Sequence, residues 1–239
     1  MKVIILAGGK GTRISEETQD KPKPMVDING KPILWHLMNI FSKQGFNEFI
    51  IATGYKGEII KKWALESNQV LSNWDINCYE TGIETFTGNR VKMCLELNSN
   101  DRILVTYGDA LANISLTNLI EFHVSHGKLA TVTAVRPPAR FGYLEIINGK
   151  VSNFSEKNQS DVGRINGGFF ILEPKVLEYF DGTDEPFETG VLPLLTKRGE
   201  LMAYEHNGFW KPMDTLREKL ELTRLARESS NITPPWLNF

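Results

Sequence analysis

The chain contains 239 residues, of which 41% are hydrophobic and 23% charged, and its formal net charge at pH 7 is −2. This length and composition predict one soluble domain, residues 1–239, and the near-neutral charge argues against a general nucleic-acid-binding protein. Because the sequence shows no signal peptide, no membrane-spanning stretch and no disulfide pattern, we expect a cytoplasmic protein without membrane or nucleic-acid partners.

Strand-like and helix-like segments alternate along most of the chain. Apolar runs predict strands over residues 1–7, 49–53, 75–79, 102–107, 129–135, 165–172 and 201–205. Apolar residues at helical spacing predict helices between them, the first closed by Gly45 and another by Gly127, and a last helix over 216–228. This alternation favours an α/β protein with a largely parallel sheet and helices on both of its faces.

Two segments depart from this alternation. Residues 143–154 predict a hairpin whose turn, Asn148-Gly149, is typical of type I′. The Pro-Pro-Trp segment at 234–236 is expected to lie over the surface.

The first strand ends in a glycine-rich, cationic turn, Gly8-Gly9-Lys10-Gly11-Thr12-Arg13, and Lys21-Pro22-Lys23-Pro24-Met25 follows. Glycines let the backbone turn tightly and present N–H groups to an anion, while Arg13 and Lys23 add positive charge. The dinucleotide fingerprint would need a glycine where Ile14 stands, and the P-loop triplet is absent. A turn with incidental basic residues is the alternative, but the added motifs favour a phosphate site.

Acidic residues at two places are candidate metal ligands. The strand predicted at 102–107 ends in Gly108-Asp109, and Asp214 precedes the last helix. Open α/β sheets bind ligands at the carboxyl ends of their strands, and Mg²⁺ takes one or two carboxylates together with substrate phosphates. A turn cap is the alternative for Asp109, and for Asp214 a helix N-cap explains the residue better on sequence alone. Thr87 or Gly88, near a helix N-terminus, would offer a further anion site.

These motifs together resemble those of the sugar-1-phosphate nucleotidylyltransferases, and most closely the glucose-1-phosphate cytidylyltransferases. The resemblance is carried by residues 6–13, 21–25, 107–109 and 209–215. It implies a Rossmann-like mixed sheet with a small β-rich sugar-binding lobe, in which residues 1–136 mainly bind nucleotide and residues 137–239 mainly bind sugar phosphate. The implied reaction transfers a cytidylyl group from CTP to a sugar 1-phosphate, expected to be glucose 1-phosphate, within surface-polysaccharide or lipopolysaccharide biosynthesis.

The resemblance also implies a role for individual residues. Asp109 and Asp214 would hold Mg²⁺ or Mn²⁺, and the catalytic residues Arg13 and Lys23 would bind the triphosphate. The other expected nucleotide-binding residues are Leu6, Ala7, Gly8, Gly9, Gly11, Thr12, Thr87, Gly88, Arg90 and Gly108. The expected sugar-phosphate-binding residues are Gly142, Glu156, Lys157, Asn166 and Trp210. The ordinary alternatives are a glycine in a β-bulge for Gly142, a surface lysine for Lys157, a turn residue for Asn166 and a core residue for Trp210.

The chain departs from the cytidylyltransferase pattern at four places. Ala110 stands where glycine is usual, Asn113 where aspartate is common and Asn158 where proline is typical. A segment that these enzymes carry between Tyr79 and Glu80, where neighbouring subunits meet, is absent, so a homo-oligomer stays an open expectation.

Two further hypotheses stay open. The first is the same chemistry with another nucleoside triphosphate or another phosphorylated acceptor. The second is a non-catalytic nucleotide-binding regulatory subunit, against which the presence of Arg13, Lys23, Asp109 and Asp214 argues.

Overall fold

The computed structural model describes residues 1–239 except 71–72, 99, 138–142, 156–162 and 230–232. Its centre is an eight-stranded sheet in the order β11-β8-β12-β6-β1-β4-β5, with β13 paired to the other side of β8. All strands run parallel except β11 and β12, so the predicted mixed, mostly parallel sheet is confirmed. The strands are β1 (Val3–Ala7), β4 (Glu48–Thr53), β5 (Asp75–Glu80), β6 (Ile103–Tyr107), β8 (Ala130–Val135), β11 (Ile165–Asn166), β12 (Phe170–Leu172) and β13 (Leu201–His206).

Strand β1 lies in the middle of the parallel part of the sheet. All five of its residues are buried, and Val3 pairs with Phe49 on β4 and with Leu104 on β6. A strand that is covered by helices on both faces needs apolar side chains on both, which is why residues 3–7 form a continuous apolar run. The strand therefore delivers the glycine turn at a fixed place on the carboxyl edge of the sheet.

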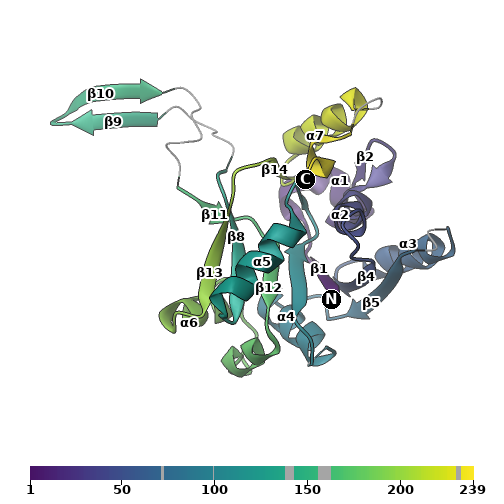
Figure 1. Cartoon of the computed structure of the whole chain (residues 1–239). Coiled ribbons are helices and arrows are strands. Elements are labelled where there is room, and N and C mark those ends of the chain that lie inside the picture. The colour runs from purple at the N-terminus through teal and green to yellow at the C-terminus, as the bar shows by residue number, and fades with distance from the viewer. Residues whose placement is uncertain (71–72, 99, 138–142, 156–162, 230–232) are drawn as a thin grey trace.

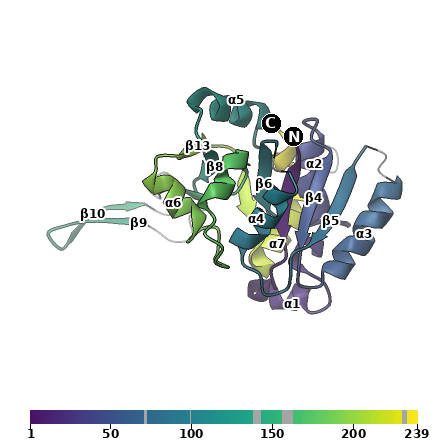
Figure 2. The same cartoon turned by 90° about the horizontal axis from the view of Figure 1, so that it is seen from below.

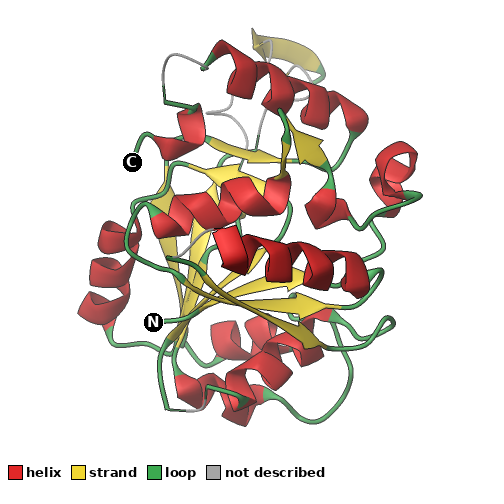
Figure 3. Cartoon of the chain, turned by 90° about the vertical axis from the view of Figure 1, so that its right-hand side faces the viewer, coloured by secondary structure: helices red, strands yellow, loops and turns green. Residues whose placement is uncertain are grey.

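Helices cover both faces of the sheet (Figure 3). Helices α2, α3, α5 and α7 pack on the side that contains Val3 and Ile5, and α4 and α6 pack on the side that contains Ile4 and Leu6. No described helix is both long enough and apolar enough to cross a membrane. The helices are α1 (Ser15–Thr18), α2 (Ile33–Ser42), α3 (Gly57–Val70), α4 (Thr87–Glu96), α5 (Leu116–His126), α6 (Val191–Lys197) and α7 (Leu216–Glu228), with the 3-10 turns η1 (Thr12–Ile14), η2 (Lys23–Met25), η4 (Pro174–Tyr179) and η5 (Pro235–Leu237).

A small antiparallel ribbon joins two distant parts of the chain. Strand β7 (Ala110–Ala112) pairs with β14 (Trp210–Pro212), and the N–H of Met213 donates to the carbonyl of Asp109 at 2.8 Å. Ala110 is buried and lies opposite Pro212 in this ribbon. The pairing places the residues that follow β6 beside those that precede α7. A second short ribbon pairs β2 (Asp27–Ile28) with β3 (Lys31–Pro32).

The predicted hairpin is confirmed as strands β9 (Tyr143–Ile147) and β10 (Lys150–Ser155), which extend away from the sheet (Figures 1 and 2). Asn148 and Gly149 have φ values of 50° and 79°, as a type I′ turn requires. Three apolar side chains on this hairpin are more than half exposed, namely those of Ile146, Ile147 and Val151.

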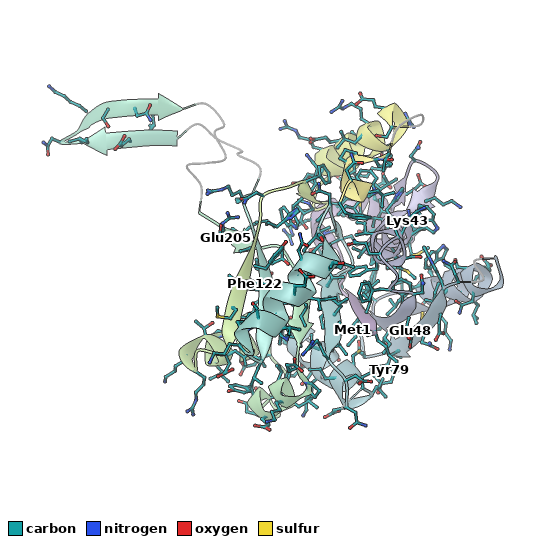
Figure 4. The ribbon with its side chains drawn as sticks, viewed as in Figure 1. Met1, Lys43, Glu48, Tyr79, Phe122 and Glu205 are labelled. Carbon is teal, nitrogen blue, oxygen red and sulfur yellow. The ribbon has the colours of Figure 1, made fainter. Side chains whose placement is uncertain are left out.

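Strand β5 forms one edge of the sheet and runs without a break through Tyr79 and Glu80, between which the resemblance predicts that a segment is absent. Tyr79 pairs with Ala52 and Glu80 with Thr53 in a regular parallel register. Figure 4 shows Tyr79 on this edge, near the strand that Glu48 begins. At this position the chain forms an ordinary edge strand.

The C-terminal tail is more deeply inserted than the sequence predicted. Trp236 is fully buried, with its ring centroid 5.5 Å from that of His36 and 6.0 Å from that of Phe209. The prediction of a surface tail was wrong for this residue, because burial of a large indole ring removes much apolar surface from water. Asn113 helps to hold the tail, since its Nδ2 donates to the carbonyl of Asn238 at 2.8 Å.

We expect Trp236→Ala to lower the free energy of unfolding by roughly 3–5 kcal/mol, the usual cost of emptying a buried aromatic site. Urea unfolding followed by circular dichroism measures this change. Phe239→Ala is the matched control, because its ring is 48% exposed and its loss should cost well under about 1 kcal/mol. Equal effects of the two substitutions would show that Trp236 is not part of the core.

Two of the histidines share a hydrogen-bonded network around Thr131. His123 Nδ1 and His126 Nε2 lie 2.7 and 2.8 Å from the Thr131 hydroxyl, and the Lys128 N–H donates to His126 Nδ1 at 2.9 Å. A proton on His126 Nδ1 would face that N–H donor, so the ring is held neutral. Burial lowers the pKa of each histidine in the chain, His36, His123, His126 and His206.

We expect the protein to lose stability as the pH falls from about 7.5 to about 5.5. Unfolded imidazoles titrate near pH ~6.5, so the unfolded state takes up protons that the folded state excludes, and the free energy of unfolding falls. Urea titrations at the two pH values test this. A protein equally stable or more stable at the lower pH would contradict it.

Candidate active site

A cavity of about 560 Å³ opens at the carboxyl ends of β1 and β6. Two groups of residues form its walls: the glycine turn with η2, and residues 83–87 with Arg90. Among the predicted site residues, those lining it are Leu6, Ala7, Gly8, Gly9, Gly11, Thr12, Arg13, Lys23, Thr87, Arg90, Gly108 and Asp109. The structure therefore gathers twelve residues from four separate stretches of the chain around one space.

The glycine turn is shaped by close packing at Gly8 and by a left-handed backbone at Gly11. A Cβ atom on Gly8 would lie 2.0 Å from Nη1 of Arg90, so a larger residue there would displace the Arg90 guanidinium. Gly11 has a φ of 65° and directly precedes η1, which carries Thr12 and Arg13. These two constraints turn the chain over the end of β1 and leave Gly9 exposed at the cavity.

Arg90 holds the two walls together. Its buried guanidinium donates to the carbonyls of Thr53 at 3.0 Å, Gly8 at 3.4 Å and Ile83 at 3.3 Å, and also to the hydroxyl of Thr81. Burial lowers the pKa of Arg90. These protein acceptors show that the guanidinium supports the glycine turn and the opposite loop from behind.

Gly88 does not line the cavity, although it was predicted to bind nucleotide. Its N–H donates to the carbonyl of Glu185 at 3.1 Å, and a Cβ atom there would lie 2.3 Å from the same oxygen. Two residues earlier, the N–H of Phe86 donates to Asp184 Oδ1 at 3.0 Å. The N-terminus of α4 is thus partly occupied by the segment that precedes α6.

A charged cluster lies where β6 and the β7–β14 ribbon meet the glycine turn. The buried ammonium of Lys23 donates to Asp109 Oδ2 at 2.6 Å and to Asp214 Oδ1 at 2.7 Å. Arg13 Nη1 donates to Asp214 Oδ2 at 2.8 Å. Burial lowers the pKa of Lys23, but the two carboxylates outweigh it, so the net shift of that pKa is upward. Lys23 is therefore held as a cation.

The two carboxylates fit the ligand set of a divalent magnesium-type ion. Both already contact a single cation, so their oxygens converge on one place. The described residues contain no group of three or more His, Cys, Asp or Glu side chains that could hold a metal without help. Mg²⁺ commonly binds through one or two carboxylates and completes its octahedron with substrate phosphates and water. The pair of aspartates at the phosphate cavity matches that pattern.

Two of the residues predicted to bind the sugar phosphate, Asn166 and Trp210, lie within the described part of the chain. Asn166 lies on β11, and its Nδ2 donates to the hydroxyl of Tyr107 at 3.0 Å. Trp210 is half-buried, packs against the core and donates from Nε1 to the carbonyl of Gly167 at 2.9 Å. Both residues are thus brought near the end of β6. The predicted residues Gly142, Glu156 and Lys157, and the departure at Asn158, lie outside the described residues.

Tyr107 and Glu188 are among the side chains that the structure ties to the site and that the sequence did not predict. Tyr107 lines the cavity directly before Gly108-Asp109, and its hydroxyl contacts the carboxylate of Glu188. Tyr107 belonged to the quoted Tyr-Gly-Asp motif, so a signal was present. Glu188 stands in an ordinary polar stretch, and its partners are 81 and 101 residues away in the chain, so no local pattern could have identified it.

Comparison with known proteins defines the class. The family description for nucleotidyl transferases matches residues 2–224. The chain is 44% identical to the glucose-1-phosphate cytidylyltransferase of Salmonella typhimurium, over 99% of this chain and 98% of that one. It is 32% identical to the mannose-1-phosphate guanylyltransferase catalytic subunit beta of Xenopus tropicalis, over 100% of this chain and 68% of that one. The protein therefore belongs to the nucleotidyl transferase family, as the sequence motifs predicted.

Solved structures agree. The crystal structure of HddC from Yersinia pseudotuberculosis superposes with a TM-score of 0.75 at 28% identity, covering 93% of this chain and 98% of that one. The Salmonella alignment extends over 256 positions, more than the 239 residues of this chain, so that relative carries residues that this chain lacks.

Proposed function

We propose that the protein transfers a cytidylyl group from CTP to a sugar 1-phosphate, with glucose 1-phosphate as the acceptor, and releases pyrophosphate. The observation that carries the proposal is the contact of Lys23 with both Asp109 and Asp214 at the glycine-lined cavity. The choice of base and sugar is supported by the 44% identity with the Salmonella cytidylyltransferase along nearly the whole chain.

The chemistry needs no general base. The second ionisation of a phosphate monoester lies near pKa ~6, so the attacking oxygen of the sugar 1-phosphate is already anionic at neutral pH. It forms a bond to the α-phosphorus of CTP while the bond to the pyrophosphate oxygen breaks. The work left to the enzyme is to align these groups and to offset their negative charge.

The residues at the cavity divide this work. The glycine turn lines the space where the triphosphate would lie, and its backbone N–H groups would bind phosphate oxygens there. Arg13, whose side chain is 74% exposed at the mouth, would bind the β- and γ-phosphates, and Lys23 would stabilise charge at the α-phosphate. A Mg²⁺ or Mn²⁺ ion on Asp109 and Asp214 would supply further neutralisation of phosphate charge when bound. Asn166 and Trp210 would contact the sugar.

A panel of four nucleoside triphosphates crossed with several sugar 1-phosphates tests the assignment. We expect pyrophosphate release to be fastest with CTP and glucose 1-phosphate. Release with UTP, dTTP or GTP alone would replace the cytidylyl assignment with the same chemistry on another nucleotide. No release with any pair would contradict the enzymatic function and favour a regulatory subunit.

We expect Asp109→Asn to lower kcat/KM by at least about 10²-fold. The neutral amide lacks the negative charge that would hold the metal ion beside the phosphates. Steady-state pyrophosphate release with Mg²⁺ measures this. Asp75→Asn, an exposed change on the edge strand β5, is the control and should leave the rate nearly unchanged. Near-normal turnover by the Asp109 variant would remove this residue from the mechanism.

A further inference from the structure

The carboxylate of Glu188 joins two parts of the site that the sequence motifs leave separate. Glu188 lies in the turn at residues 187–190, directly before α6. Its Oε2 accepts a hydrogen bond from the Thr87 hydroxyl at 2.7 Å, and its Oε1 accepts one from the Tyr107 hydroxyl. Thr87 lies at the wall formed by residues 83–87, whereas Tyr107 ends β6 beside the aspartate cluster.

The direction of each hydrogen bond in this network is fixed by backbone donors at its two ends. The N–H of Gly168 donates to Asn166 Oδ1 at 2.9 Å, so the amide nitrogen of Asn166 faces Tyr107 and donates to its hydroxyl at 3.0 Å. The Tyr107 hydroxyl therefore donates its own hydrogen to Glu188. At the other end the N–H of Phe187 donates to the Thr87 hydroxyl at 2.9 Å, so the Thr87 proton also goes to Glu188.

Both oxygens at position 188 must accordingly be acceptors. An ionised carboxylate meets this requirement, whereas the amide of glutamine would present a donor to one of the two hydroxyls. Within the described residues the Glu188 carboxylate forms no ion pair, and its hydrogen-bond partners are these two hydroxyls.

The turn that carries Glu188 is itself fixed to the N-terminus of α4. The N–H groups of Gly88 and Phe86 donate to the carbonyl of Glu185 and to Asp184 Oδ1, as described above. Thr87 therefore lies between two backbone anchors and one charged acceptor. Moving Glu188 would shift this wall of the cavity relative to β6.

We propose that Glu188 is a positioning residue. Through Tyr107 it fixes Thr87, on the nucleotide side, relative to Asn166, on the acceptor side. This inference rests on the proposed function and deepens it, because it names what fixes the two substrates relative to each other. Tyr107 is two residues before Asp109, so the same hydrogen bonds also help to position the end of β6, which this carboxylate follows.

The test compares Glu188→Gln, Tyr107→Phe and the double variant by their KM for each substrate. We expect Glu188→Gln to raise the KM for CTP and for the sugar 1-phosphate by about tenfold each, the effect of losing one hydrogen bond to a charged group. Tyr107→Phe should raise mainly the KM for the sugar 1-phosphate. The double variant should match Tyr107→Phe in that KM, because residues that act in series are not additive.

Glu185→Gln is the matched control, because its carboxylate lies on the same segment as that of Glu188. Among the described side chains, only that of Thr183 donates a hydrogen bond to it. It should leave both KM values unchanged, and thermal unfolding should show all variants folded. Unchanged KM values in Glu188→Gln, a loss of stability alone, or fully multiplicative effects in the double variant would each overturn the proposal. A wild-type protein that releases no pyrophosphate with any substrate pair would instead mean that the proposed function had failed.

Discussion

The site depends on one long-range pairing, that of β7 with β14. The pairing brings Asp109, which follows β6, beside Asp214, which precedes α7, and the Lys23 ammonium lies against both. Two carboxylates this close would repel each other if left alone, and the buried cation offsets that repulsion. The glycine turn, the Arg90 contacts and the Glu188 network all place other groups around this charged centre.

The fold explains why such a centre can exist at the edge of a well-packed core. Strand β1 is buried on both faces and fixes the start of the glycine turn, while Arg90 fixes its return against the opposite wall. Burial strengthens the attraction between Lys23 and its carboxylates because little water screens it. Gly8 has no side chain, and the Arg90 guanidinium lies in the space that one would occupy.

Local sequence patterns predicted the features that depend on neighbouring residues. The apolar run before the glycine turn, the Asn148-Gly149 turn and the alternation of strands and helices were all confirmed. Contacts across the chain were beyond such patterns: Asp214 looked like a helix cap, Trp236 like a surface residue and Glu188 like any polar residue. The structure assigns the capping role to Thr215, whose hydroxyl accepts from the N–H of Glu218, and leaves Asp214 for Lys23 and Arg13.

The central claim is that Asp109 and Asp214 form one cation site at the phosphate cavity. Electron paramagnetic resonance of Mn²⁺ titrated into the protein with CTP measures this without relying on turnover. The account predicts one bound Mn²⁺ per chain, lost in Asp109→Asn and equally in Asp214→Asn. Undiminished Mn²⁺ binding in either variant would contradict it.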